Sequence, residues 1–151
     1  MTRELIKKSY LAAALSSAGI IVAIVLYAVV GEVLARAGHK PPLPPPAAYA
    51  VKYAVYILSI ASVFALRFAA ARLDARRATP EAAVKALTAR AIVTAALCEV
   101  PAVAGLILFI LTGYKADFYL LLIFSAGLEV YHFPRLRLWE EKLRTDFGQL
   151  P

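Results

Sequence analysis

Long apolar segments, separated by short clusters of charge, constrain this chain more than any other feature. The first three segments span approximately residues 10–30, 49–71 and 91–111. Each holds the roughly 20 residues that a helix needs to cross the hydrocarbon core of a bilayer. The fourth, at about 118–133, is shorter, but its flanking aromatic residues can extend it into the membrane interface. The pattern predicts four transmembrane helices.

The overall composition agrees with this pattern. Hydrophobic residues make up 62% of the chain and the mean hydropathy is +0.71, whereas an ordinary soluble domain is about half apolar. We therefore predict an all-α integral membrane protein in which residues 1–151 form one domain, with two antiparallel hairpins and a tail at 134–151. The first segment is longer than the roughly 7–15 apolar residues of a signal peptide, so we expect a retained helix.

The distribution of Lys and Arg predicts the orientation in the membrane. Both chain ends and the connection between the second and third segments are rich in these residues. The first and third connections hold only Arg36, Lys40 and Lys115. With four crossings, all three basic segments lie on one side, so we expect a cell (inner) membrane protein with both termini in the cytoplasm. The net charge of +7 then reflects topology, and we expect no nucleic acid partner.

The connections between the segments differ in character. The first, GHKPPLPPPAAY, holds five prolines and predicts an extended, stiff spacer, with a docking site for a partner as the alternative. In the second, Thr79-Pro80-Glu81 is typical of a helix start, so the third helix should begin in the cytoplasm. Gly113 should end that helix, and YKAD should form a short turn before the fourth.

The last segment predicts a break followed by a short helix. Pro134 should end or kink the fourth helix, and LRLWEEKLRTDF should form an interfacial helix with Trp139 at the membrane interface. Because little of the chain lies outside the membrane, a membrane-protein partner or a second copy of the chain is expected. The other expected partner is the bilayer itself, with anionic inner-leaflet lipids at Arg72, Arg76, Arg77, Arg135 and Arg137.

Three ionisable residues, Arg67, Glu99 and Glu129, fall inside the apolar segments. At 1.5 Å per residue, they lie about 7–8, 13 and 9 Å from the cytoplasmic edge. Because each costs a few kcal/mol in the membrane, we expect one interior cluster in which Arg67 faces both carboxylates. One cation and two carboxylates leave a negative charge unless one carboxylate is protonated. The cluster is therefore either an ion pair that fixes packing or a site for a proton or cation.

Neighbouring residues support this cluster. Pro101 should free the backbone carbonyl of Leu97 beside Glu99, and Ser125 and His132 lie near Glu129 in sequence. The single cysteine, Cys98, cannot form an internal disulfide, and we expect it to behave as a small hydrophobe. We find no zinc spacing, P-loop or dinucleotide motif, so we expect no metal and no cofactor.

One of the segments has a family resemblance. The stretch AIVTAALCEVPAVAGLILFIL, residues 91–111, resembles the ion-carrying helix of the c-type proteolipid subunits of rotary ATPases. The resemblance implies that Glu99 is an ion-binding carboxylate, with Ala95, Ala96, Ala102 and Gly105 around it. As a whole, the chain looks more like the small four-helix membrane proteins of prokaryotes.

Three functions stay open on the sequence alone. The first is a non-enzymatic accessory or assembly partner of a membrane complex. The second is a protein that binds or translocates a proton or cation at Glu99. The third is an enzyme acting on a lipid or quinone, which would need a pocket near Tyr131 and His132. We favour a non-enzyme, because the sequence offers no nucleophile–base pair and no metal-ligand set.

Overall fold

The structure, a computed structural model, describes residues 3–73 and 79–148, and within these ranges every regular element is a helix. The helices are α1 (Arg3–Arg36), α2 (Pro45–Leu73), α3 (Pro80–Thr112), α4 (Lys115–His132) and α5 (Leu136–Phe147). In the described residues α1, α2 and α3 are each long and apolar enough to cross a membrane. Helices α4 and α5 meet these criteria of length and composition only as a pair, with a bend of 45° between them. The predicted helical class is confirmed, and the fourth crossing stays a prediction.

The ends of α3 follow the signals in the sequence. Thr79 caps the start, where its hydroxyl accepts the backbone N–H of Ala82 at 3.3 Å, and Pro80 takes the first helical position. Gly113 ends the helix with φ of 74°, and its N–H donates to the carbonyl of Phe109 at 2.8 Å. Because α4 begins at Lys115, the turn after Gly113 is shorter than predicted.

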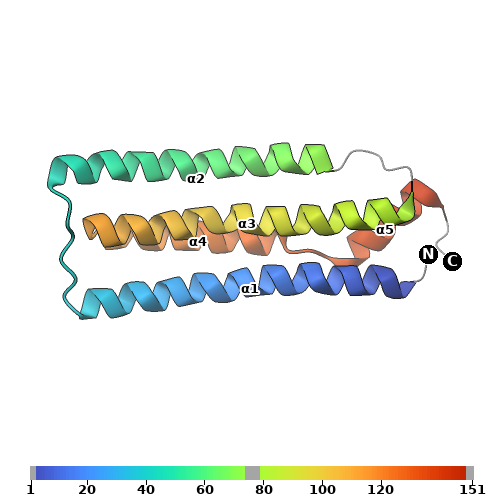
Figure 1. Ribbon diagram of the computed structural model, residues 1–151, viewed down its shortest axis with the longest axis horizontal. Coiled ribbons are helices and arrows are strands. Elements are labelled where there is room, and N and C mark those ends of the chain that lie inside the picture. Colours follow the sequence, from blue (N-terminus) through green and yellow to red (C-terminus); the bar gives the residue numbers. More distant parts are fainter. Residues whose placement is uncertain (1–2, 74–78, 149–151) are drawn as a thin grey trace.

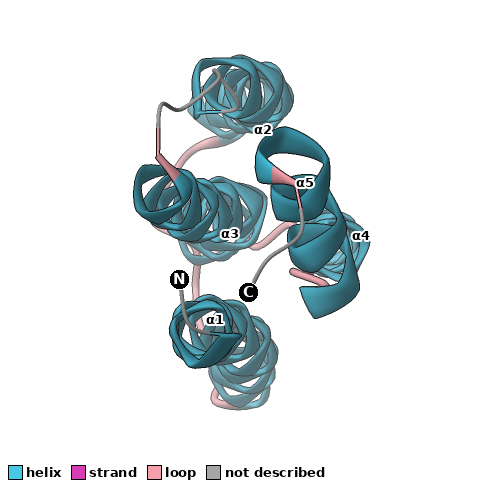
Figure 2. Ribbon diagram, turned by 90° about the vertical axis from the view of Figure 1, so that its right-hand side faces the viewer, coloured by secondary structure: helices cyan, strands magenta, loops and turns pink. Residues whose placement is uncertain are grey.

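Helix α3 lies at the centre of the bundle. Helices α1 and α2 pack against opposite sides of it, and α4 packs against a third side (Figure 1, Figure 2). The prediction of two antiparallel hairpins is therefore wrong for the first pair, because α1 and α2 are separated by α3, whereas α3 packs against both of its neighbours in sequence, α2 and α4. The reason is the connection 37–44, which crosses the end of α3. There the N–H of Leu43 donates to the carbonyl of Leu111, and His39 Nε2 lies 2.7 Å from the carbonyl oxygen of Ile110.

The predicted break and tail helix are confirmed, and the side chain of Trp139 faces the protein rather than its surroundings, while its depth in the membrane stays a prediction. Trp139 is only 6% exposed, and with Leu143 it packs against Ile6 of α1 and Val84 of α3. Trp139 is buried because α1 and α3 continue beyond their apolar segments toward the basic end of the bundle. Their extensions offer apolar side chains that cover the indole, so Trp139 is part of the protein core.

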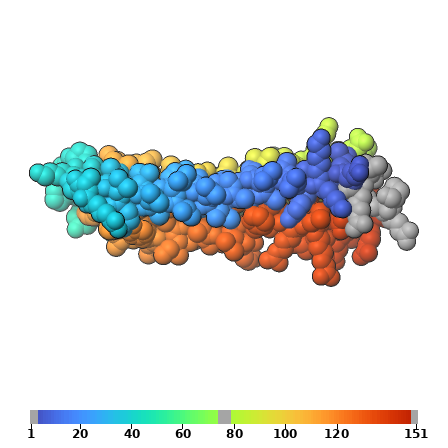
Figure 3. Space-filling model, turned by 90° about the horizontal axis from the view of Figure 1, so that it is seen from below, coloured from blue at the N-terminus to red at the C-terminus, as the bar shows by residue number. Residues whose placement is uncertain are grey.

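The exterior of the bundle is apolar and part of its interior is polar. Large apolar side chains on α1 and α2 point outward, whereas Ser17, Ser59, Ser62, Thr94 and Ser125 are buried. Figure 3 shows α1 along one long face, with α4 and α5 beside it. A soluble protein rarely exposes so large an apolar surface, while hydroxyl groups between helices are common in membrane bundles. The distribution is compatible with a membrane protein.

Candidate functional site

Glu129 of α4 is the more deeply buried of the two predicted carboxylates. It is 1% exposed, and the hydroxyl of Ser17 and the thiol of Cys98 are its hydrogen-bonding neighbours. Its second oxygen, Oε2, has no hydrogen-bond partner among the described residues. An unpaired oxygen on a buried carboxylate is costly, above all when the group is ionised. The site therefore contains a buried carboxyl group, that of Glu129, with one oxygen that accepts no hydrogen bond from the described residues.

Glu99 of α3 lies near Glu129 and has a different environment. The hydroxyl of Tyr27 on α1 donates a hydrogen bond of 2.5 Å to Glu99 Oε1. Glu99 is partly exposed, and it is close enough to act on Glu129 by charge repulsion. The structure thus brings together the two predicted carboxylates, one partly accessible and one fully enclosed.

The polar contacts continue across the interface between α3 and α4. The hydroxyl of Ser125 donates to the carbonyl of Cys98 at 2.5 Å, in the turn of α3 that precedes Pro101. The helix continues through this proline, although proline supplies no N–H to the carbonyl of Leu97. Ser125, expected to support the site, therefore binds the backbone beside it.

Arg67 does not join this cluster, and the prediction of an Arg67–Glu99–Glu129 cluster is wrong in this respect. None of the described acidic side chains forms an ion pair with Arg67. The reason is the central position of α3. Glu99 lies five residues after Thr94, which faces the cavity shared with α2, and five residues rotate a helix by about 140°. Glu99 consequently faces α1, while Arg67 lines the cavity.

His132 lies at the end of α4, exposed, and its Nδ1 is 3.0 Å from the carbonyl oxygen of Leu128. Its ring packs edge-on against Tyr131, with centroids 4.9 Å apart. A cavity is indeed present beside these two residues, as the enzyme hypothesis would require. The described part of the chain contains no group of three or more His, Cys, Asp or Glu side chains that could hold a metal ion.

Sequence reasoning missed Tyr27 and Ser17, which supply donors from α1. Both are common residue types in an apolar helix, and the only available signal was the need of each buried carboxylate for a donor. The contact between the thiol of Cys98 and the carboxyl group of Glu129 was missed as well. The sequence places the thiol next to Glu99, but the structure points it toward Glu129.

A second polar group, also missed, ties the opposite end of the bundle together. Asp117 of α4 pairs with Lys52 at 2.9 Å and accepts a hydrogen bond from Tyr56 at 2.7 Å. Glu32 of α1 pairs with Lys115 at 2.9 Å and accepts a hydrogen bond from Tyr119. These contacts join α4 to α2 and to α1, so they are well placed to fix the helices at this end.

Three of the five arginines expected to meet anionic lipids, Arg72, Arg135 and Arg137, lie at the basic end. Arg135 and Arg137 are exposed, and the guanidinium of Arg72 lies 4.8 Å from the ring centroid of Phe68. Arg76 and Arg77 lie outside the described residues.

Comparison with family models, with curated proteins and with solved structures gave no significant match for this chain.

Proposed function

We propose that the protein is a four-crossing membrane protein that binds a proton at the Glu99–Glu129 pair. In this proposal α4 forms the fourth crossing, with α5 turning along the cytoplasmic interface. Both chain ends and the connection between α2 and α3 then face the cytoplasm. The start of α1 and the end of α5 do lie at the same end of the bundle (Figure 1), and this end is rich in Lys and Arg.

The single observation that carries the proposal is that Oε2 of Glu129, a residue only 1% exposed, has no hydrogen-bond partner among the described residues. Ionised, Glu129 would place a charge in the apolar interior against a hydroxyl, a thiol and the nearby Glu99. An unpaired buried charge costs several kcal/mol, whereas a missing hydrogen bond to a neutral group costs about 1–3 kcal/mol. Binding a proton removes the larger of these two penalties.

The two carboxylates suit different steps of proton exchange. Glu99 is the partly exposed member, held by Tyr27, and Glu129 is the enclosed one. A proton that enters at Glu99 relieves the repulsion between the two groups and can then be held at Glu129. The one-helix resemblance to c-type proteolipids supports an ion-binding role for Glu99, while burial favours Glu129 as the group that retains the proton.

Carbodiimide labelling tests the proposal, because these reagents modify protonated carboxyl groups in apolar surroundings. The purified protein in detergent is treated near neutral pH, and the modified residues are identified by mass spectrometry. We expect modification at Glu129, its loss in Glu129→Gln, and slower modification as the pH rises. Glu32, which is paired with Lys115, is the internal control and should stay unmodified. Absence of modification at Glu129 even at mildly acidic pH would contradict the proposal.

An accessory role is a second proposal, supported by the position of α2. This helix packs mainly against α3, and it exposes Tyr53, Ile57 and Phe64 on its outer side. Such a face is available to another membrane protein as well as to lipid. Co-purification of one partner that persists in Glu129→Gln and is lost in Ile57→Trp would favour this role. Loss of the partner in Glu129→Gln would link it to the proton site instead.

A further inference from the structure

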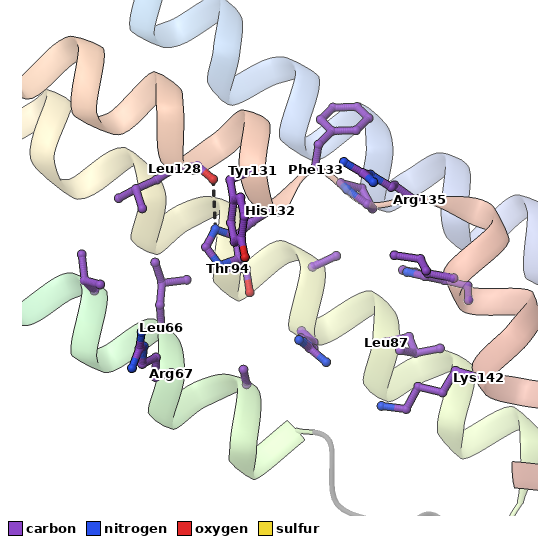
Figure 4. Close-up of a pocket in the computed structure, with 17 residues that line it drawn as sticks. Leu66, Arg67, Leu87, Thr94, Leu128, Tyr131, His132, Phe133, Arg135 and Lys142 are labelled. Carbon is purple, nitrogen blue, oxygen red and sulfur yellow. Dashed lines mark hydrogen bonds between the residues drawn. The ribbon is translucent and has the colours of Figure 1, made fainter. Parts of the chain in front are cut away.

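A cavity of about 820 Å³ lies at the basic end of the bundle, and neither Glu99 nor Glu129 is among its described lining residues. Its walls come from α2, α3, α4 and α5 and from the break between the last two helices. Figure 4 shows labelled side chains from each: Arg67 on α2, Thr94 on α3, His132 on α4 and Lys142 on α5. The cavity exists because α4 ends at His132, while α2 and α3 continue past it.

The charged groups of this cavity have one sign. Arg67, Arg90, Arg135 and Lys142 line it together with His132, and no Asp or Glu is among the described lining residues. Arg90 and Lys142 each have an interaction partner within the protein. Arg67, in contrast, is exposed and forms no ion pair with the described acidic residues. The chemistry of the cavity therefore favours an anion, and guanidinium groups suit phosphate oxygens in particular.

The rest of the lining is apolar. Leu66, Leu87, Leu128 and Trp139 contribute to the walls. These apolar walls offer no favourable contact to a small inorganic anion, whereas they can pack against the first part of a lipid acyl chain. Arg67, His132 and Arg135 are exposed, so the cavity opens to the surroundings of the protein.

We propose that this cavity binds the phosphate headgroup of an anionic lipid, with Arg67 as the principal contact. The proposal rests on the membrane orientation proposed above, which places the cavity at the level of the cytoplasmic leaflet. Basic pockets between transmembrane helices on this side are suited to lipid headgroups. The proposal does not rest on proton binding by Glu129. It goes beyond the general attraction of surface arginines because it assigns one cavity with named lining residues.

Trp139 provides a direct readout, because it is the single tryptophan of the chain and it lines the cavity. The full chain is reconstituted into phosphatidylcholine vesicles that contain small amounts of brominated phosphatidylglycerol or, separately, brominated phosphatidylcholine with the same chains. Bromine quenches the indole only at close range. We expect stronger and saturable quenching by the anionic lipid.

Two variants and a competitor identify the site. Arg67→Gln should weaken the preference for the anionic lipid about fivefold, as expected for the loss of one cation at the membrane surface. Arg36→Gln removes an exposed cation at the other end of the bundle and should leave the preference unchanged. Glu129→Gln should also leave it unchanged. Inorganic phosphate should not reduce the quenching.

Equal quenching by the two lipids, or an unchanged preference in Arg67→Gln, would overturn the lipid site alone. Loss of the preference on addition of inorganic phosphate would show a site for a small anion and would also overturn it. A chain that stays in the soluble fraction and does not float with the vesicles would contradict the membrane orientation together with this proposal.

Discussion

Glu129 has fewer polar neighbours than its two oxygens require. Two side-chain donors, from Ser17 and Cys98, surround one part of the carboxyl group, and Oε2 remains without a partner among the described residues. The electrostatic argument for a bound proton depends on this local deficit. This lack of a partner distinguishes Glu129 from Glu32 and Asp117, which have cationic partners at the other end of the bundle.

Replacement of Glu129 by glutamine tests its charge state through stability. A neutral amide of the same shape should change the free energy of unfolding by no more than about 1 kcal/mol, because it replaces a neutral acid. If Glu129 were an ionised member of a buried ion pair, the substitution would destabilise the protein by about 3–5 kcal/mol. Unfolding in mixed detergent micelles at neutral pH distinguishes the two cases.

Replacement of Tyr27 by phenylalanine removes the donor to Glu99. We expect a loss of about 1–3 kcal/mol of unfolding free energy, because a partly buried carboxylate oxygen is left without its hydrogen bond. Tyr53→Phe is the matched control, since this residue is 65% exposed, and it should stay within about 0.5 kcal/mol of the parent protein. Equal stability of the two variants would contradict the role of Tyr27.

At the scale of the helices, close packing depends on two glycines. A Cβ built on Gly31 of α1 would lie 2.3 Å from Cε1 of Phe118, and one on Gly105 of α3 would lie 2.9 Å from Cβ of Leu121. The ring of Phe118 cannot easily move, because it is fully buried and stacks on Phe109 with centroids 5.4 Å apart.

Alanine at Gly31 should therefore destabilise the bundle by about 1–3 kcal/mol, the usual range for overpacking. Gly127 offers the matched control, since a Cβ there meets nothing within 4 Å. Alanine at Gly127 should be neutral or stabilising by about 0.5–1 kcal/mol, because it favours the helix. Thermal unfolding of the two variants in one detergent gives the comparison.

The docking of α5 should depend on Trp139. Truncation to alanine removes a buried aromatic side chain and should cost about 3–5 kcal/mol, and we expect the tail to become sensitive to protease. Leu138→Ala is the control, because Leu138 is 56% exposed on the same helix. A tail that stays protected in Trp139→Ala would show that α5 is held by other contacts.

The elements themselves were the easiest part to predict. Apolar length, the Thr79-Pro80 start, Gly113 and Pro134 are local signals, and the helices follow them closely. Helix neighbours were harder, because connection 37–44 is long enough to cross α3 and no local signal shows this. For the same reason, the sequence could not predict that Glu99 faces α1. A helix with apolar residues all round does not reveal which neighbour each face meets.

At the scale of the whole molecule, charge and polarity set the proposed orientation. The basic end holds α5, the cavity and the described end of α2, while the other end holds connection 37–44 and the ion pairs of Lys52 and Lys115. The sequence predicted this asymmetry from its Lys and Arg distribution. It could not predict the cavity, which depends on three separate helices and on the short length of α4.

Cysteine labelling in cells tests the orientation. In a Cys98→Ala background, Lys40→Cys should react with a membrane-impermeant maleimide in intact cells, and Glu141→Cys should react only after the membrane is opened. Both positions are exposed in the structure, so access depends on the membrane side. Reaction of Glu141→Cys in intact cells would place the tail outside and contradict the orientation.

Infrared spectroscopy of the protein in lipid tests proton binding at Glu129 most directly. A protonated carboxyl group has a C=O stretching band that an ionised carboxylate lacks, and a group sheltered from water keeps this band when exposed carboxyls have lost theirs. We expect such a band at neutral pH in the parent protein, its retention in Glu99→Gln and its loss in Glu129→Gln. A parent spectrum without the band, or one that Glu129→Gln leaves unchanged, would contradict the proposed proton site.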